Sequence, residues 1–292
     1  MAPFRLEVQP PFSLELTVLV LRRVPTNIVD QWAAGVYVRA FQAGVARVRQ
    51  LDERTLELSS EDAAPVVRRV LGLDVDPALL GQAVAAEPRL QALAERAGGL
   101  RPPRFPSLFE AIGMTIPFQQ VSLAAGQSIA NRVVQRFGRP RGPAWLFPTP
   151  ETIAGASLDE LRACGLSQAK AHTLQSAAER ILDGRLSESK LPELSSEDVV
   201  QALEQVPGVG PWTAGVIALR GLGRLDVFPR GDVGARRTLA RLLGQPAPLT
   251  VAEEDDLLAR LGPTRGMVYF LGLAATRASS IQGALRPPGA PA

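Results

Sequence analysis

The chain is poor in the residues that bind metals, form disulfides or act as nucleophiles. Its 292 residues include one cysteine, Cys164, and one histidine, His172. A single cysteine excludes an internal disulfide and a four-cysteine iron–sulfur cluster. Any Ser-His-Asp or Cys-His site would have to use the single histidine. No group of His, Cys and acidic residues has the spacing of metal ligands. These counts disfavour metal and triad chemistry.

Lysine and long apolar runs are scarce as well. Only Lys170 and Lys190 are lysines among the 32 basic residues, so an amine nucleophile has few candidates. We expect no signal peptide, and the sequence has no apolar run long enough to span a membrane. Together with the free cysteine, this predicts a cytoplasmic location. The pI near 9.6 comes from arginine, which suits phosphate binding but can equally reflect genome base composition.

The periodicity of the sequence changes near residue 98. Alternating apolar and polar residues before this point predict a small antiparallel sheet, with strands at Phe4–Val8, Val36–Phe41, Val45–Leu51 and Thr55–Leu58. Helical periodicity at Pro65–Leu71 and Ala78–Ala97 predicts helices over one face of the sheet. Residues 99–282 show helix after helix with no convincing strand pattern, and 283–292 are expected to be a disordered tail. The predicted class is α+β, with domains at 1–98 and 99–282.

The segment LEQVPGVGPWTAGVIALRG, residues 203–221, predicts two helices joined by a tight hairpin. Ser195 or Ser196 can cap a first helix that runs to about Gln205, and a second helix starts near Pro211. The glycines of the intervening Pro207-Gly208-Val209-Gly210 permit backbone angles that other residues avoid. Amides at the start of the second helix can bind a phosphate without side-chain charge, which indicates a nucleic-acid backbone. Many Pro-Gly turns, however, only reverse the chain.

An acidic residue follows the hairpin in the segment DVFPRGD, at Asp232. It precedes a helical pattern over Val233–Leu243, where a capping position and the helix dipole would keep the carboxylate ionised. An aspartate at a helix start is more often a cap than a catalyst. Asp226, six residues earlier, is the natural control.

The hairpin and its surroundings resemble the helix-hairpin-helix superfamily of DNA base-excision glycosylases. The resemblance rests on Val206 before the hairpin, Trp212-Thr213-Ala214 after it and Asp232 at the catalytic aspartate position. Trp212 stands where members that also cut the backbone carry a Schiff-base lysine, which favours a monofunctional enzyme. Three further blocks resemble the AlkA type of 3-methyladenine DNA glycosylase in order and spacing: PPFSLELTVLVL, IPFQQVSLAAGQSIANRVVQRFG and LFPTPETIAGASLDELRACGLSQAKAHTLQSAAERI.

The resemblance implies a fold and an activity. The fold would be a sheet domain similar to half of a TATA-binding protein, followed by two helical lobes around an active-site cleft. The activity would be to flip alkylated bases such as 3-methyladenine out of double-stranded DNA and hydrolyse the N-glycosidic bond, leaving an abasic site. Asp232 would stabilise the positive charge that develops on the sugar. No cofactor would be required, and the protein would be a monomer that binds no membrane.

The resemblance also assigns roles at the DNA. Gln120, with Gln119, would be the wedge that enters the duplex, where the best-known AlkA pattern has leucine. The base pocket would include Phe12, Trp212, Val216 and Leu273; since Val216 replaces a tyrosine and Leu273-Ala274 an aromatic pair, this pocket is expected to be less aromatic. Phosphate would bind at Pro207, Gly208, Val209, Gly210 and Thr213, and the backbone carbonyls of Glu204, Val206 and Val209 could hold a structural Na⁺ or K⁺.

Two alternatives stay open on the sequence. The departures at Val216 and Leu273 are compatible with a helix-hairpin-helix protein that binds damaged DNA without catalysis, although retention of Asp232 argues against it. The chain could also be a glycosylase for deaminated or oxidised bases. Analysis of the released products separates these possibilities, because a protein that only binds damage releases no base.

Overall fold

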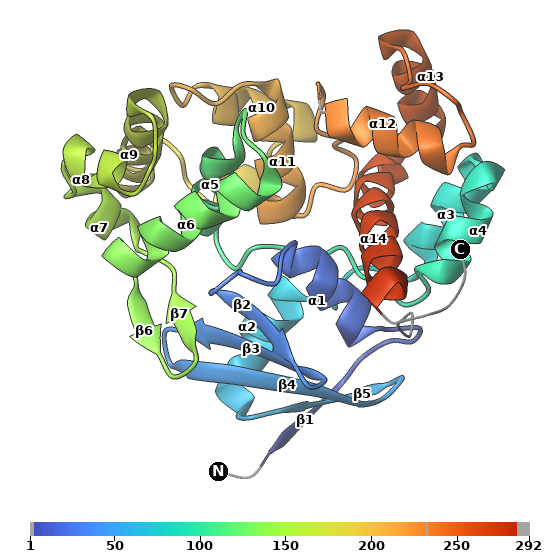
Figure 1. Cartoon of the computed structure of the whole chain (residues 1–292), viewed down its shortest axis with the longest axis horizontal. Helices are drawn as coiled ribbons and strands as arrows, with labels where there is room; N and C mark the ends of the chain where they lie inside the picture. Colours follow the sequence, from blue (N-terminus) through green and yellow to red (C-terminus); the bar gives the residue numbers. More distant parts are fainter. Residues whose placement is uncertain (1–2, 232, 285–292) are drawn as a thin grey trace.

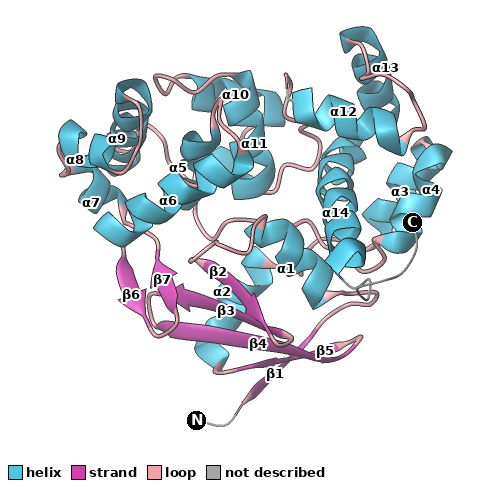
Figure 2. Cartoon of the chain, in the orientation of Figure 1, coloured by secondary structure: helices cyan, strands magenta, loops and turns pink. Residues whose placement is uncertain are grey.

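The computed structural model describes residues 3–231 and 233–284 and has the predicted α+β class, with a sheet below a large set of helices (Figures 1 and 2). The strands are β1 Phe4–Glu7, β2 Asp30–Ala33, β3 Val36–Phe41, β4 Gly44–Asp52, β5 Thr55–Leu58, β6 Arg139–Arg141 and β7 Ala144–Leu146. The α-helices are α1 Leu14–Arg22, α2 Ala64–Val70, α3 Ala78–Ala86, α4 Gln91–Arg96, α5 Leu108–Gly113, α6 Leu123–Phe137, α7 Pro150–Ala154, α8 Leu158–Ala163, α9 Gln168–Leu182, α10 Ser196–Glu204, α11 Pro211–Leu222, α12 Val233–Leu242, α13 Val251–Leu261 and α14 Arg265–Ala284.

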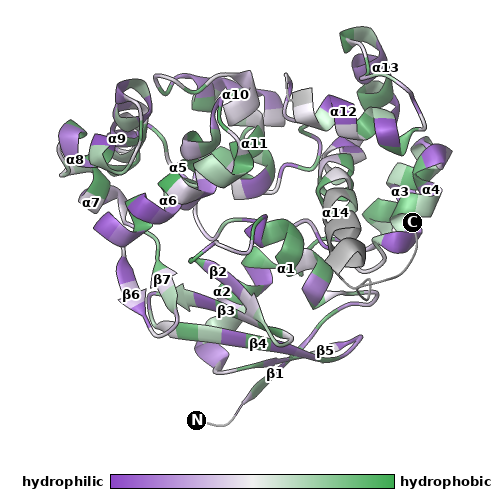
Figure 3. Cartoon of the chain, in the orientation of Figure 1, coloured by the Kyte–Doolittle hydropathy of each residue, from purple (hydrophilic) through white to green (hydrophobic). Residues whose placement is uncertain are grey.

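The first five strands form one antiparallel sheet in the order β1-β5-β4-β3-β2. The four strands predicted from alternation are present. Strand β2 was not predicted, because its sequence DQWA has no clean alternation and its position follows from pairing with β3. Helix α1, mostly hydrophobic along its length (Figure 3), packs into the same core as the inner face of the sheet. Alternation thus predicts the strands whose inward residues fill this core.

The interpretation of residues 99–282 as free of strands is wrong at one place. Strands β6 and β7 form a two-stranded hairpin, and β7 lies against β3. Ala144 of β7 packs with Val38 and Ala40, on the face of the large sheet opposite α1. Each strand of the hairpin has three residues, which is too short for alternation to be detected, and Pro140 lies within β6.

The predicted helical stretch Ala78–Ala97 is two helices rather than one. Helix α3 ends at Ala86, Glu87 leaves the helical conformation with φ −141°, and Pro88 begins a short 3-10 turn before α4. Proline lacks the amide that a continuous helix needs, and it disfavours helical angles at the residue before it. The apolar periodicity continues across the break because α3 and α4 pack into the same core.

That core joins the two ends of the chain. It combines Val20 of α1, Leu90 and Leu93 near α4, and Leu219 of α11 with Val268 and further residues of α14. Helix α14 runs beside α1, α3 and α12 (Figure 1). A second core fills the space between α5, α6, α9, α10 and α11. The helical region therefore has two lobes, and α11 contributes to both.

Candidate nucleic-acid interface and base pocket

The predicted helix-hairpin-helix is present at the junction of α10 and α11. The hydroxyl of Ser195 accepts a hydrogen bond from the amide of Asp198, 3.1 Å away, and so caps α10. The helix ends at Glu204, and Pro211 begins α11 after the hairpin. Nine residues of α11, from Thr213 to Gly221, are buried. The second helix is thus anchored in the protein while its first turn and the hairpin reach the surface.

Gly208 allows the hairpin to pack closely on α9. Its φ is +83°, and a Cβ at this position would lie 2.0 Å from the hydroxyl oxygen of Thr173. Gly210, in the same hairpin, has φ −99° and no neighbour within 4 Å of a Cβ. Only Gly208 therefore needs to be glycine for both its backbone angle and its space.

The hairpin leaves some of its amides available. The amide of Val209 donates to the carbonyl of Val206 at 3.0 Å. The amides of Gly208 and Gly210 have no such bond with the described part of the chain. Because they lie next to the positive end of the twelve-residue helix α11, they are placed to bind an anion.

The predicted wedge loop lies directly against this hairpin. It follows a 3-10 turn, Ile116–Phe118, and ends at Ser122, which caps α6. The side-chain amide of Gln119 donates to the carbonyl of Gly208 and to the hydroxyl of Thr213, each at 3.0 Å. Gln120 is exposed and has φ +55°, a left-handed conformation that a glutamine seldom adopts. Two segments predicted separately to contact DNA are therefore joined by Gln119.

Lys170 supports the wedge loop from α9. Its ammonium group donates to the carbonyls of Gln119 at 2.6 Å and Pro117 at 3.1 Å. Burial lowers the pKa of Lys170. Lys170 is distant from the helix-hairpin-helix motif in sequence, yet the fold brings α9 under both the wedge loop and the hairpin. Sequence spacing alone held no signal for this contact.

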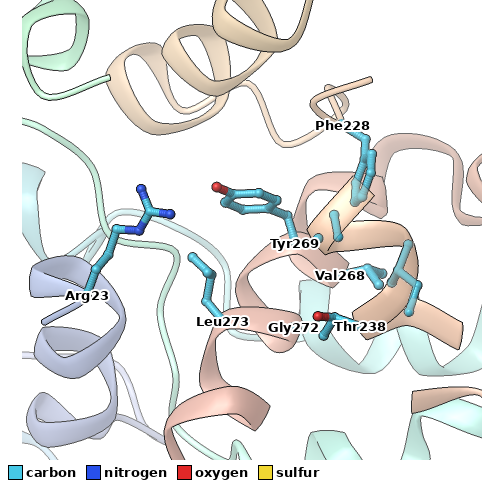
Figure 4. Close-up of a pocket in the computed structure, with 10 residues that line it drawn as sticks. Arg23, Phe228, Thr238, Val268, Tyr269, Gly272 and Leu273 are labelled. Carbon is cyan, nitrogen blue, oxygen red and sulfur yellow. The ribbon is translucent and has the colours of Figure 1, made fainter. Parts of the chain in front are cut away.

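A cavity of about 190 Å³ opens between α1, α12 and α14, far more than the about 10–15 Å³ that one water needs. Figure 4 shows Arg23, Phe228, Tyr269 and Leu273 around it. The remaining lining residues are Gly234, Ala235, Thr238, Leu239, Val268 and Gly272. Gly234 and Ala235 follow Asp232 in the sequence by two and three positions, so the cavity adjoins the segment that carries the predicted catalytic residue.

Asp232 itself lies outside the described residues. The loop before it packs tightly on the hairpin's second helix, because a Cβ on Gly215 of α11 would lie 2.9 Å from the Cα of Pro229. Helix α12 begins at Val233, directly after Asp232. Asp226, the control residue, accepts a hydrogen bond from the hydroxyl of Ser196 at 2.8 Å.

Of the four residues predicted for the base pocket, Leu273 is the one that lines this cavity. Val216 is 3% exposed on α11, and Trp212 is half-buried against the core beneath the hairpin. Phe12 is 5% exposed in the core between the sheet and α1. Arg23 and Phe228 were not predicted as pocket residues. Arg23 lies far from the motif in sequence, and arginines at the end of an apolar helix carry no signal of their own.

Arg220 is almost fully buried beside the cavity. It is 1% exposed, donates to the carbonyl of Leu21 at 3.0 Å and lies 4.8 Å from the ring centre of Phe105. Burial, together with the nearby positive charge of Arg23, lowers the pKa of Arg220 to about 10. Its guanidinium thus ties α11 to α1 and to the segment before α5 without a carboxylate partner among the described residues.

The structure holds few groups suited to metals or membranes. In residues 3–231 and 233–284, no three His, Cys, Asp or Glu residues lie together as a metal site would require. Within the same ranges, no helix has the length and apolar character needed to cross a bilayer. Val206, one of the carbonyls predicted to bind a monovalent cation, already accepts one hydrogen bond from Val209 and keeps a second lone pair.

Comparison with known proteins gives consistent matches. Residues 114–262 match the model of the HhH-GPD superfamily base excision DNA repair protein. The chain is 30% identical to DNA-3-methyladenine glycosylase 2 of Escherichia coli over 252 residues, 78% of this chain and 84% of that protein. It is 33% identical over 135 residues to a putative DNA-3-methyladenine glycosylase of Bacillus subtilis, a match that covers 46% of this chain and only 47% of that relative's length. The solved 3-methyladenine DNA-glycosylase from Archaeoglobus fulgidus superposes with a TM-score of 0.80 at 26% identity, over 95% of this chain and 99% of that one.

Proposed function

Since this chain belongs to the HhH-GPD superfamily of base excision DNA repair proteins, we propose that it is a monofunctional glycosylase that removes alkylated bases from double-stranded DNA. Its similarity to 3-methyladenine glycosylases supports alkylated purines as the substrate class. The observation that carries the proposal is the junction at Gln119. Gln119 holds the predicted wedge loop and the predicted phosphate-binding hairpin together.

The reaction begins with extrusion of the damaged nucleotide. A base inside a stacked duplex cannot be reached, so unstacking must be offset by a side chain that fills the gap and by contacts with the extruded base. Gln120, which is exposed and follows Gln119 in the predicted wedge loop, would fill that gap. The amides of the hairpin would hold the DNA backbone while the base turns out.

Bond cleavage would depend on Asp232. Loss of the base builds positive charge on the sugar, and a fixed carboxylate stabilises this charge more in the transition state than in the ground state. The cavity beside α12 would receive the base, since its wall includes Gly234 and Ala235, two and three positions after Asp232 in sequence. The same carboxylate could orient the water that attacks the sugar.

Water rather than an amine would complete the reaction. Trp212 occupies the position of the lysine in related enzymes that also cleave the backbone. The ammonium of Lys170 is engaged by two backbone carbonyls, and Lys190 begins a short turn before α10. The product would therefore be an intact strand with an abasic site. We further propose that the protein acts as a monomer in the cytoplasm, and that the carbonyls of Glu204, Val206 and Val209 hold a structural Na⁺ or K⁺ near the DNA phosphate.

The test compares wild type, Asp232→Asn and Asp226→Asn on methylated duplex DNA. Released bases are identified by chromatography, and abasic sites are scored as strand breaks before and after alkali. We expect the wild type and Asp226→Asn to release methylpurines and to give breaks only after alkali, and Asp232→Asn to lose at least about a hundredfold in rate. Tight DNA binding with no base release by the wild type would instead identify a non-catalytic damage-binding protein.

A further inference from the structure

A second cavity, of about 460 Å³, lies between the large sheet and the helical region. Its wall is formed by the end of β3, by α2, by the start of α5 and by the segment between β7 and α7. Small-molecule sites in proteins typically enclose about 300–1,000 Å³ within mostly apolar walls. Most of this wall is apolar or aromatic, with Phe41, Val66, Phe109, Leu146, Phe147 and Ile181. The cavity thus has the size and the lining of a small-molecule site.

A buried ion cluster forms the polar end of this wall. Asp30 of β2 lies directly opposite Arg39 of β3, and Arg39 donates hydrogen bonds to Asp30 and to Glu110 of α5. The hydroxyl of Tyr37 donates to the same carboxylate of Asp30 at 2.7 Å. The side chains of Asp30, Arg39 and Glu110 are 0%, 3% and 7% exposed. The cluster therefore holds two carboxylates against one guanidinium.

Glu110 has one carboxylate oxygen without a partner. Its Oε1 accepts the hydrogen bond from Arg39. Its Oε2 forms no hydrogen bond with residues 3–231 and 233–284 and is not fully buried, so it opens onto the cavity that Glu110 lines. Burial raises the pKa of Glu110, and the nearby Asp30 adds to this effect while Arg39 opposes it. A carboxylate in so apolar a wall is stabilised by any ligand that donates to it.

The other acidic residue that lines the cavity is already satisfied. Glu188 accepts a hydrogen bond from Arg69 at 2.6 Å and another from the amide of Leu108 at 2.7 Å. In the ion cluster, the guanidinium offsets only one of the two carboxylates. Glu110 thus supplies one unmatched negative charge when it is ionised. A ligand that carries a positive, hydrogen-bond-donating group would complete the cluster.

The cavity is separate from the predicted DNA-binding elements and from the cavity beside α12. Among the described residues, its lining includes none from the wedge loop, the hairpin or α12, the helix that follows Asp232. Ile181, in this wall, lies roughly three turns of α9, or about 16 Å, from Lys170 under the wedge loop. A ligand bound here would therefore leave the predicted DNA surface free.

We propose that this cavity binds a flat, two-ring aromatic cation with an amidine edge, whose paired N–H groups donate to the carboxylate of Glu110. An amidinium group matches a carboxylate with two parallel, charge-assisted hydrogen bonds. The rings of Phe109 and Phe147 meet edge to face with their centres 6.1 Å apart, and they give the cation an aromatic wall. The site goes beyond the proposed glycosylase function and does not depend on it.

The experiment is a calorimetric titration with naphthamidine, which is cationic, and with naphthamide, its neutral counterpart. The proteins are wild type, Glu110→Gln, which removes the charge, and Val66→Trp, which fills the cavity from α2 without touching the ion cluster. Glu95→Gln is the matched control, because Glu95 is exposed on α4 and its side chain bonds to Gln91 at 2.6 Å. Thermal unfolding shows whether each variant is folded.

We expect one naphthamidine to bind the wild type at least about tenfold more tightly than naphthamide. Glu110→Gln should abolish this preference. Val66→Trp should weaken the binding of both compounds by about tenfold or more, and Glu95→Gln should bind as the wild type does. Naphthamidine should also raise the unfolding temperature of the wild type, and it should do so less in the two cavity variants.

Two results with the wild type would overturn the inference, namely no binding of naphthamidine and equal affinity for the two compounds. A preference that survives in Glu110→Gln and Val66→Trp would overturn it as well, because the cation would then bind elsewhere. If Glu110→Gln does not fold, Val66→Trp alone decides this point.

Asp232→Asn tests the main alternative site, the cavity beside α12. Loss of the preference in Asp232→Asn and in no other variant would place the cation there and overturn the inference. We expect Asp232→Asn to bind naphthamidine as the wild type does. The titration contains no DNA, so its result is independent of the test of base release.

Discussion

The side-chain amide of Gln119 donates to the hydroxyl of Thr213 at 3.0 Å and thereby joins the wedge loop to the first turn of α11. A second bond from the same amide reaches the carbonyl of Gly208 in the hairpin. Lys170 holds the main chain of Gln119 from the other side. The side chain that would enter the duplex and the amides that would bind its phosphate thus form one unit, whose geometry is set before DNA arrives.

Gln119→Leu should uncouple these two parts. The substitution is close in size and removes both hydrogen bonds, so we expect a loss of about 0.5–1.5 kcal/mol in the free energy of unfolding. Base release should slow by about tenfold, because a small misplacement of a positioning loop is costly for the rate. Single-turnover kinetics and urea unfolding check both values. A variant that is less stable but releases base at the wild-type rate would show that the junction serves the fold alone.

Gly208→Ala tests the close approach of the hairpin to α9. Alanine would be strained at φ +83°, and its Cβ would overlap the hydroxyl of Thr173. We expect a loss of about 1–3 kcal/mol in stability and weaker binding to duplex DNA with an abasic-site analogue. Gly210→Ala is the matched control, because that position has an ordinary φ and open space. Equal effects of the two substitutions, measured by thermal unfolding and by binding titration, would contradict this assignment.

Gln120→Leu tests whether the wedge residue contacts the base that was paired with the extruded one. Glutamine can fill the gap and also hydrogen-bond the base that has lost its partner, whereas leucine can only fill the gap. We expect the wild type to excise with a preference among the four opposite bases and the variant to show a flatter profile. The measurement is base release opposite each of the four bases. An identical preference in both proteins would contradict a role of Gln120 in opposite-base preference.

Glu87 makes the stability of the protein depend on acidic pH. Hydrogen bonds from Arg89, and further from Arg260 of α13, lower the pKa of Glu87 to about 2 from its ordinary value of 4.5. Because the folded-state pKa is depressed, the stabilisation is complete above about pH 4.5 and disappears as the pH falls toward 2. Glu87→Gln should therefore cost about 1–2 kcal/mol at pH 7, a value reduced because both arginines are half-exposed.

Urea unfolding of wild type and Glu87→Gln at several pH values measures this difference. The gap between the two proteins should close as the pH falls from 4.5 toward 2. A gap of constant size would mean that Glu87 acts through packing and not through its charge.

The sequence predicted the parts of this protein whose signals are local. Ser195, Pro207, Gly208 and Pro211 mark the ends of α10 and α11 because capping and chain reversal depend on residues a few positions apart. Four strands of the large sheet were also predicted, including β3, although both faces of β3 are covered in the structure. Strand β2 was missed because its sequence does not alternate, and the β6–β7 hairpin was missed because each of its strands has only three residues. The positions of both follow from pairing with their neighbours.

Contacts between distant segments could not be predicted in the same way. Arg23 meets Tyr269 at the cavity because α14 packs beside α1, and nothing in the local sequence of either helix indicates that pairing. The contact of Lys170 could not be predicted either, because it depends on the wedge loop lying over α9. The resemblance transferred roles only to a few positions of the family's motif. Arg23 lies outside the resembling blocks, and Lys170 lies in one of them, residues 146–181, without a role having been assigned to it.

The shared core of α1, α3, α4 and α14 has a consequence for how the protein is made. During synthesis the first hundred residues leave the ribosome long before α13 and α14, so the apolar faces of α3 and α4 lack most of their partners until these last two helices arrive. The sheet can form early with α1 and α2, but that second core closes only when the two ends of the chain meet. Premature termination before α14 would therefore leave a fragment with exposed apolar surface that is prone to aggregate, and not a shorter active enzyme.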